Sequence, residues 1–136
     1  MVVNLQPADA WELIKSSGDA WLVDVRTPPE LQYVGGPDLK EVGNRYLHLP
    51  WHVWPKMTVN PDFLPGLAQA IASQNTPVMF LCRSGGRSLA AAKAAEEAGW
   101  TQTMNILHGF EGDLDDAGRR NRLNGWKAAE LPWRQT

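Results

Sequence analysis

The chain has 136 residues, of which 43% are hydrophobic and 21% are charged, and its formal net charge is −2. This length fits one domain of ordinary size, which buries about two thirds of the surface of its unfolded chain. Without a basic excess, the composition excludes nucleic acid as a general partner, and no apolar run is long enough to cross a membrane. The single cysteine rules out an internal disulfide and fits a reducing compartment, so we expect a cytoplasmic location.

Helical and extended patterns alternate along the chain, and no internal repeat or low-complexity tract interrupts them. The expected strands are short and apolar, while the expected helices carry their apolar residues three and four positions apart. This alternation predicts an α/β fold with a mostly parallel sheet covered by helices on both faces. In chain order, the expected elements are a helix over 8–16, a strand over 20–25, a helical turn over 28–33, a helix over 62–73, a strand over 77–81, a helix over 88–98 and a strand over 103–107.

Cys82, the only cysteine, stands between an apolar strand and an alanine-rich helix that Gly99 ends. Its thiol is therefore expected at the carboxyl end of a strand, where a loop turns into a helix N-terminus and ligands of open α/β sheets gather. Backbone N–H groups of such a loop converge on an anion, and the helix dipole adds to the attraction. The same field favours the thiolate, which is the nucleophilic form of cysteine.

The residues that follow Cys82 distinguish a reactive thiol from a packing residue. A lone cysteine is most often a small buried hydrophobic residue. Here, two arginines flank the thiol, and two glycines remove side-chain bulk so that the backbone can approach a ligand closely. Such residues make a poor core and a good cradle for an oxyanion. We therefore predict a nucleophilic Cys82 whose substrate is bound by Arg83, Ser84, Gly85, Gly86, Arg87 and Ser88.

Three ordered motifs give the chain a resemblance to a rhodanese (sulfurtransferase) domain over roughly residues 5–112. The segment 78–112 resembles the active-site half of that family, with its Cys-Arg-Ser-Gly-Gly-Arg-Ser loop and its His-Gly-Phe-Glu-Gly run. The segment 21–30 resembles the family strand that ends in Asp-Val-Arg, and 42–50 resembles its second short strand. The His-Ile-Pro-Gly-Ala type motif that normally precedes this second strand is replaced by the glycine- and charge-rich segment 35–41.

The resemblance implies a rhodanese-like three-layer fold, with about five strands, in a single domain over 1–136. Its core would span 5–112, followed by a charged excursion over 113–124 and a C-terminal cap over 125–136. Acidic and basic residues alternate in the excursion, which fits either a solvated surface loop or a docking loop for a partner.

The resemblance also implies a ping-pong transfer of sulfur. Cys82 would attack the outer sulfur of thiosulfate or of a persulfide donor, and the resulting Cys82 persulfide would wait for an acceptor. Because the chain has no second cysteine, this acceptor has to be external: cyanide, a small thiol or the thiol of a partner protein. No cofactor is implied, and the three histidines lack metal-ligand spacing with the cysteine, so no metal site is expected.

Two residues at the end of the first strand are expected to support the loop. Asp24 would accept hydrogen bonds from the active-site loop, and Arg26 would pair with Glu30 and so fix the turn between them. Two other functions stay open: a rhodanese-like binding or regulatory module without turnover, and a phosphatase or arsenate reductase. The loop length disfavours the second, since the related tyrosine phosphatases use Cys-x5-Arg and this chain has Cys-x4-Arg.

Overall fold

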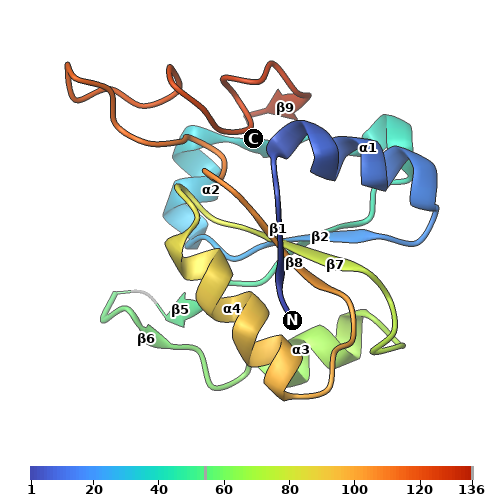
Figure 1. Cartoon of the computed structure of the whole chain (residues 1–136). Helices are drawn as coiled ribbons and strands as arrows, with labels where there is room; N and C mark the ends of the chain where they lie inside the picture. The colour runs from blue at the N-terminus through green and yellow to red at the C-terminus, as the bar shows by residue number, and fades with distance from the viewer. Residues whose placement is uncertain (54, 136) are drawn as a thin grey trace.

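A computed structural model describes residues 1–53 and 55–135, so Trp54 and Thr136, the last residue of the expected cap, lie outside the described part. The centre of the fold is a five-stranded parallel sheet (Figure 1). The strand that precedes Cys82 lies in the middle of this sheet. In spatial order, the strands are β1 (Val3–Leu5), β8 (Thr103–Ile106), β7 (Val78–Leu81), β2 (Trp21–Asp24) and β4 (Tyr46–His48).

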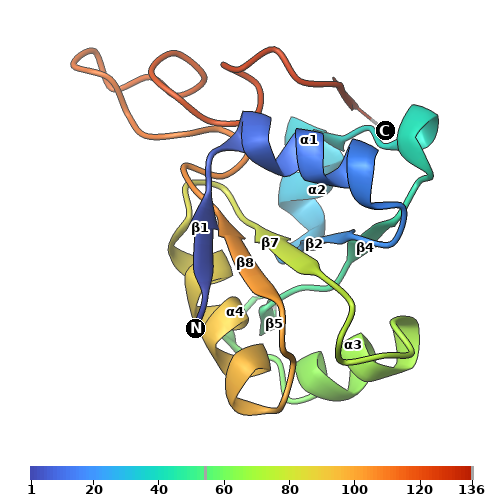
Figure 2. The same cartoon turned by 45° about the vertical axis from the view of Figure 1, so that its right-hand side comes forward.

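Helices cover both faces of the sheet, as Figure 2 shows, and this confirms the predicted α/β architecture. Ala10 and Ile14 of the first helix are buried against one face. Phe63 and Leu67 of the third helix and Ala91 of the fourth are buried against the other. The helices are α1 (Pro7–Ser17), α2 (Pro28–Val34), a 3-10 turn (Lys40–Val42), α3 (Phe63–Ala70) and α4 (Gly86–Glu97).

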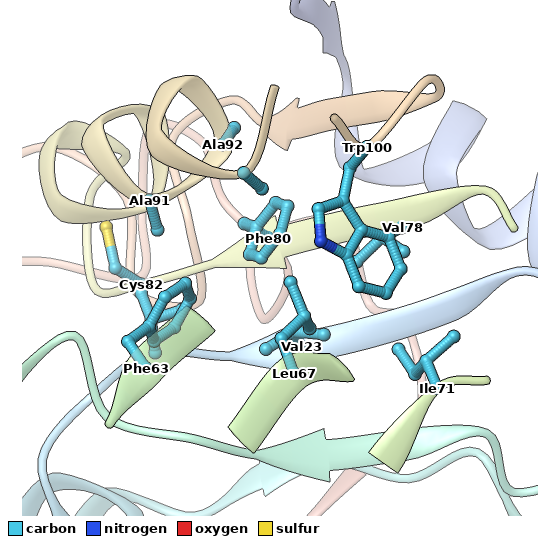
Figure 3. Packing of buried hydrophobic residues seen from close by; sticks show 12 residues of the cluster. Val23, Phe63, Leu67, Ile71, Val78, Phe80, Cys82, Ala91, Ala92 and Trp100 are labelled. Atoms are coloured by element: carbon cyan, nitrogen blue, oxygen red, sulfur yellow. The ribbon is translucent and has the colours of Figure 1, made fainter. Parts of the chain in front are cut away.

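Strand β7 is buried on both faces, which explains its unbroken apolar sequence. Val78 and Phe80 belong to the core beneath α3 and α4, whereas Met79 and Leu81 belong to the core beneath α1. Cys82 continues this alternation and joins the α3–α4 core, with its sulfur pointing toward the start of α4 (Figure 3). The strand therefore sets the direction of the thiol.

Two short antiparallel pairs lie outside the sheet. β3 (Gly36–Pro37) pairs with β9 (Trp133–Arg134) and ties the C-terminal segment to the loop after α2. β5 (His52–Val53) pairs with β6 (Thr58–Val59) and forms a hairpin after β4. Within the described part of the chain, no helix combines the length and the apolar character needed to cross a membrane.

Two helix boundaries differ from the sequence prediction by two residues or more, and the other helix boundaries agree within one residue. The helix expected over 62–73 ends at Ala70, because the next residue, Ile71, is extended, with φ −123° and ψ 111°. The helix after the active-site loop begins at Gly86 rather than at Ser88, because Gly85 precedes it in a left-handed conformation with φ 113°. This earlier start places the helix N-terminus closer to Cys82 along the chain.

Candidate active site

Neighbouring parallel strands bring the predicted site residues to one edge of the sheet. β7 ends at Leu81, immediately before Cys82, and its neighbour β2 ends at Asp24, two residues before Arg26. Leu81 and Asp24 are partners in the register of the two strands. Cys82 and the segment after Asp24 therefore leave the sheet side by side, at the edge where ligands of parallel sheets bind.

The thiol of Cys82 is surrounded by groups from the first turn of α4. The backbone N–H of Gly85 donates to Sγ at 3.0 Å, and the hydroxyl of Ser88 lies 3.3 Å from the same sulfur. Only 1% of the Cys82 residue is exposed. An N–H group that points at sulfur from a helix N-terminus stabilises a thiolate, and it would stabilise an anionic sulfur bound to it in the same way.

Arg83 lies beside Cys82 on the surface of the loop. Its side chain is exposed, and among the residues that the structure describes it takes part in no ion pair. Its guanidinium is therefore accessible to an anionic ligand that approaches the loop from solvent. Of the other loop residues, Ser84 is half-buried and Gly86 is exposed.

Arg87 is held by a carboxylate from another element. Its two terminal nitrogens donate to the two oxygens of Glu30 at 2.6 and 2.8 Å. Glu30 also accepts hydrogen bonds from the backbone N–H and the hydroxyl of Thr27, at 3.2 and 2.9 Å. The expected pair between Glu30 and Arg26 is therefore wrong, because Glu30 joins α2 to the active-site helix instead. The expected binding of a substrate by Arg87 stays a prediction.

We expect Glu30 to make the stability of the protein depend on pH. Burial alone would raise the pKa of Glu30, but the hydrogen bonds and charge of Arg87 and the hydrogen bonds of Thr27 lower this pKa from 4.5 to about 2. Because the folded-state pKa is lowered, the carboxylate stabilises the fold fully above pH 4.5, and this contribution disappears as the pH falls toward 2. Urea unfolding across this pH range should show a steeper loss of unfolding free energy for the wild type than for Glu30→Gln. Equal slopes would contradict this expectation.

A second ion pair is completely buried at the end of β2. Arg26 donates to Asp24 from Nε at 2.9 Å and from Nη2 at 2.6 Å, and it donates to the carbonyl of Gly35 at 2.8 Å. The Tyr46 hydroxyl donates to Asp24 at 2.7 Å, and the guanidinium lies 4.5 Å from the ring centre of Phe110. Burial alone would lower the pKa of Arg26, but the hydrogen bonds and charge of Asp24 raise it. Asp24 thus binds Arg26 and Tyr46, and the expectation that it accepts hydrogen bonds from the active-site loop is corrected.

The segment after β8 supports the active-site loop through its backbone. The N–H of Phe110 donates to the carbonyl of Cys82 at 2.8 Å, and the N–H of Gly112 donates to that of Arg83 at 3.2 Å. The charged excursion folds back onto the same segment, since the Arg120 guanidinium donates to the carbonyl of Gly112 at 2.7 Å. The His-Gly-Phe-Glu-Gly run therefore holds the backbone of the loop in place through these two hydrogen bonds.

Gly109 allows this supporting segment to approach the loop closely. Its φ is +62°, and a Cβ atom added there would lie 2.4 Å from the carbonyl oxygen of Cys82 and 2.6 Å from that of Arg83. We expect Gly109→Ala to displace the loop. The steric contact should lower the free energy of unfolding by about 1–3 kcal/mol beyond the cost of placing an alanine at a positive φ. Gly118→Ala is the matched control, because Gly118 has φ +76° and, among the described residues, no atom lies within 4 Å of the added Cβ. Urea unfolding measures both losses, and equal losses would show that the close contact relaxes without cost.

Ser88 leads from the thiol to a residue that the sequence did not single out. Its hydroxyl donates to Oδ1 of Asn105 at 2.6 Å, and both residues are buried. The only signal in the sequence is a polar residue between Met104 and Ile106 in an apolar strand. The sequence alone does not show that Asn105 contacts the active-site loop, because its contact with Ser88 is made only in the folded structure.

Comparisons with known proteins place this site in a family. The chain matches the rhodanese-like domain over residues 6–115. It is 37% identical over 133 residues to "Uncharacterized protein RP600 homolog" of Rickettsia rickettsii, which covers 97% of each chain. The crystal structure of Rv0390 from M. tuberculosis superposes with a TM-score of 0.90 at 44% identity, covering 99% of this chain and 98% of that chain.

A second solved structure carries a named activity. The polysulfide-sulfur transferase homodimer of Wolinella succinogenes superposes with a TM-score of 0.68 at 26% identity, covering 99% of this chain and 80% of that chain. The family match spans both the strand that ends in Asp-Val-Arg and the cysteine loop, in agreement with the resemblance of these motifs. The chain therefore belongs to the rhodanese-like domain family.

Proposed function

We propose that the protein is a sulfurtransferase in which Cys82 carries a sulfane sulfur as a persulfide between an anionic donor and an external thiophilic acceptor. The observation that carries this proposal is the hydrogen bond from the Gly85 N–H to Sγ of Cys82, at 3.0 Å, at the N-terminus of α4. The same arrangement that holds a thiolate would hold the terminal sulfur of a persulfide anion.

The reaction has two steps. In the first, the Cys82 thiolate attacks the outer sulfur of thiosulfate, a new S–S bond forms at Cys82, and sulfite leaves with the electron pair of the broken S–S bond. A polysulfide donor would react in the same way and leave as a polysulfide one sulfur shorter. In the second step, the acceptor attacks the terminal sulfur, and the thiolate of Cys82 leaves with its electron pair. Cyanide as the acceptor yields thiocyanate, and a thiolate yields a new persulfide.

The charge around the loop supports an anionic donor. Thiosulfate and polysulfides are dianions, and the exposed guanidinium of Arg83 lies beside the nucleophile. Arg87 adds positive charge on the α4 side, although its hydrogen-bonding groups are turned to Glu30. The likeness to the polysulfide-sulfur transferase of Wolinella succinogenes supports a polysulfide as one donor to be tested.

The acceptor has to be another molecule, because the chain contains a single cysteine and no second thiol can resolve the persulfide. We assign this role to a small thiol or to the thiol of a partner protein, in a reducing compartment such as the cytoplasm that keeps Cys82 in its thiol form. The site fits a phosphatase less well than a sulfurtransferase. The Cys-x4-Arg loop of this chain is one residue shorter than the Cys-x5-Arg loop with which tyrosine phosphatases enclose a phosphate.

The test is the intact mass of the protein after incubation with thiosulfate or with polysulfide, followed by removal of the donor. Either donor, or both, should add one sulfur atom per chain, and cyanide should remove it with release of thiocyanate. The single cysteine assigns the added atom to Cys82 without further mapping. An unchanged mass with both donors, in a sample whose thiol reacts fully with iodoacetamide, would overturn the proposal. Hydrolysis of p-nitrophenyl phosphate by the same sample would favour the phosphatase instead.

A further inference from the structure

A chain of hydrogen bonds runs from the thiol along one face of the sheet to its edge strand. The Ser88 hydroxyl lies 3.3 Å from Sγ of Cys82 and donates to Oδ1 of Asn105 at 2.6 Å. The Asn105 amide nitrogen in turn donates to Oδ1 of Asn4 at 3.1 Å. Ser88 is 0% exposed and Asn105 2%, whereas Asn4 is exposed on β1.

Asn105 is an unusual residue for its position. It lies on β8 between β1 and β7, in a strand whose four residues are all buried. An amide in such a place costs free energy unless both of its ends are hydrogen-bonded, and here the oxygen binds Ser88 while the nitrogen binds Asn4. Packing alone would be served by an apolar side chain. The amide is therefore explained by what it does for Ser88.

The direction of these bonds matters because a hydroxyl has only one proton to donate. As long as Ser88 donates to Asn105, it offers only a lone pair to Cys82, and this suits a neutral thiol that donates its own S–H. A thiolate or a persulfide anion has no proton to give. For such a sulfur, Ser88 has to turn its O–H toward Cys82, and its oxygen then needs a donor behind it.

An asparagine can offer Ser88 either an acceptor or a donor, because one end of its amide accepts hydrogen bonds and the other donates them. Rotation of the Asn105 amide would place its NH₂ group toward Ser88 and its oxygen toward Asn4. Asn4 can follow this rotation because its own amide is exposed to solvent. All three side chains thus keep their hydrogen bonds in both arrangements.

We infer that Asn105 is a positioning residue that acts through Ser88, so that one hydroxyl serves both the neutral thiol and the anionic sulfur of Cys82. This inference deepens the proposed function and rests on it for its role in catalysis. The other group that hydrogen-bonds this sulfur among the described residues, the Gly85 N–H, is a donor only.

Other charged groups also surround this end of the sheet and stay unchanged in the variants below. On the loop and α4 these are Arg83 and Arg87, and the α2 residue Glu30 faces the site through Arg87. The segment after β8 contributes His108 with its partner Asp113, at 3.4 Å, and the end of β2 contributes the buried pair of Arg26 and Asp24. Differences between variants therefore report on the chain of hydrogen bonds.

The central test compares Asn105→Asp with Asn105→Leu by the rate of reaction of Cys82 with iodoacetamide as a function of pH. An ionised aspartate only accepts, so it keeps the Ser88 proton and leaves the anionic sulfur without its hydroxyl donor. We expect the alkylation rate at pH 7 to fall about tenfold and the midpoint of the pH–rate profile to rise by about one pH unit. Leucine leaves Ser88 free to donate to sulfur but removes the donor behind its oxygen, so the alkylation rate should fall by only about two- to threefold, less than with aspartate.

A purely structural role for Asn105 predicts the reverse order. Leucine removes both buried hydrogen bonds, whereas aspartate is nearly isosteric with asparagine and keeps the bond to Ser88. If Asn105→Leu slows alkylation as much as Asn105→Asp does, or more, the inference is wrong. Circular dichroism and thermal unfolding of each variant confirm that folded proteins are compared.

The effect of Asn105→Asp is also measured in a Ser88→Ala variant. This comparison separates an effect that acts through the Ser88 hydroxyl from a direct effect of the aspartate charge on the thiolate. With Ser88→Ala, the hydroxyl is missing, and Asn105→Asp should then change the alkylation rate by less than about twofold. An undiminished tenfold effect in this background would mean that the carboxylate repels the thiolate directly, and it would overturn the inference.

Asn4→Asp tests the same idea without changing a buried residue, in case Asn105→Asp does not fold. A carboxylate at position 4 only accepts, so it holds the Asn105 nitrogen toward β1 and the Asn105 oxygen toward Ser88. The alkylation profile should move to higher pH, while Val3→Asp, which adds the same charge at the adjacent exposed position on the other face of β1, should leave it unchanged. Equal profiles for both variants would contradict the inference. Alkylation needs no sulfur donor, so these outcomes are independent of whether sulfur transfer itself is observed.

Discussion

Cys82→Ser is expected to abolish both the loading of sulfur and the formation of thiocyanate from thiosulfate and cyanide. A serine hydroxyl is far less nucleophilic than a thiolate at neutral pH, and no other thiol in the chain can replace it. The fold should persist, because the hydroxyl is nearly isosteric and can accept the hydrogen bond that the Gly85 N–H makes to sulfur. Intact mass, thiocyanate release and thermal unfolding measure these three outcomes.

Two further observations make the result of Cys82→Ser unambiguous. Wild-type protein whose thiol has been blocked with iodoacetamide should lose turnover to the same extent, because the reagent reaches only this cysteine. Thiocyanate release that survives both the substitution and the blocking would move the activity away from Cys82. Unblocked wild-type protein that binds thiosulfate but neither takes up sulfur nor releases thiocyanate would instead favour the binding-module alternative.

Asp24→Asn is expected to have the largest effect on stability, with a loss of about 3–5 kcal/mol in the free energy of unfolding. The substitution keeps the shape of the side chain but removes the negative charge that neutralises Arg26, and both side chains are completely buried. The guanidinium already has one terminal nitrogen, Nη1, without a hydrogen-bond partner among the described residues, so it is only partly satisfied even with Asp24 in place. Urea unfolding at neutral pH measures the loss.

Asp116→Asn serves as the matched control for Asp24→Asn. Asp116 lies in the charged excursion with an exposed side chain, so removal of its charge should change the free energy of unfolding by less than about 0.5 kcal/mol. Similar small losses in both variants would show that Arg26 does not depend on Asp24 for its charge balance. That result would require another partner for Arg26 in solution.

The buried pair and the pair on the loop have different consequences for the site. Asp24 and Arg26 lie beneath the ligand edge and contact Gly35, so they join β2 to the loop after α2. Arg87 and Glu30 remain about one-fifth exposed and join α2 to the first turn of α4. The first pair therefore stabilises the framework, and the second connects the active-site helix to a neighbouring helix.

Much of the fold and the local setting of the candidate nucleophile could be predicted from the sequence, because their signals are local. The run 77–81 is apolar and short, and the alanine-rich segment after Ser88 is a strong helix former, so both elements were predicted in place. The position of Cys82 between them predicted a thiol at a helix N-terminus, and the hydrogen bond from Gly85 to its sulfur has the geometry expected for that context. The largest difference in these two elements is at the start of the helix, which lies two residues earlier than predicted because a left-handed glycine can precede a helix directly.

Several partners of the polar side chains around the loop could not be predicted, because they come from residues far apart in the chain. Glu30 was expected to bind Arg26, four residues away, but it binds Arg87 instead, because α2 and the start of α4 leave neighbouring strands at the same edge of the sheet. Asn105 and Ser88 meet for the same reason, since β8 lies beside β7 in the sheet. Spacing along the chain carries no information about such contacts.

The sequence by itself thus determined where the single thiol stands and which local elements position it, because strand, loop and helix propensities act over a few neighbouring residues. The tertiary structure alone decided which distant residues surround that thiol. Parallel strand order places Asn105 behind Ser88, and the positive φ of Gly109 brings a distant segment against the carbonyl of Cys82. These contacts depend on the packing of the whole sheet, and the balance of charge and hydrogen bonding around the thiol depends on them.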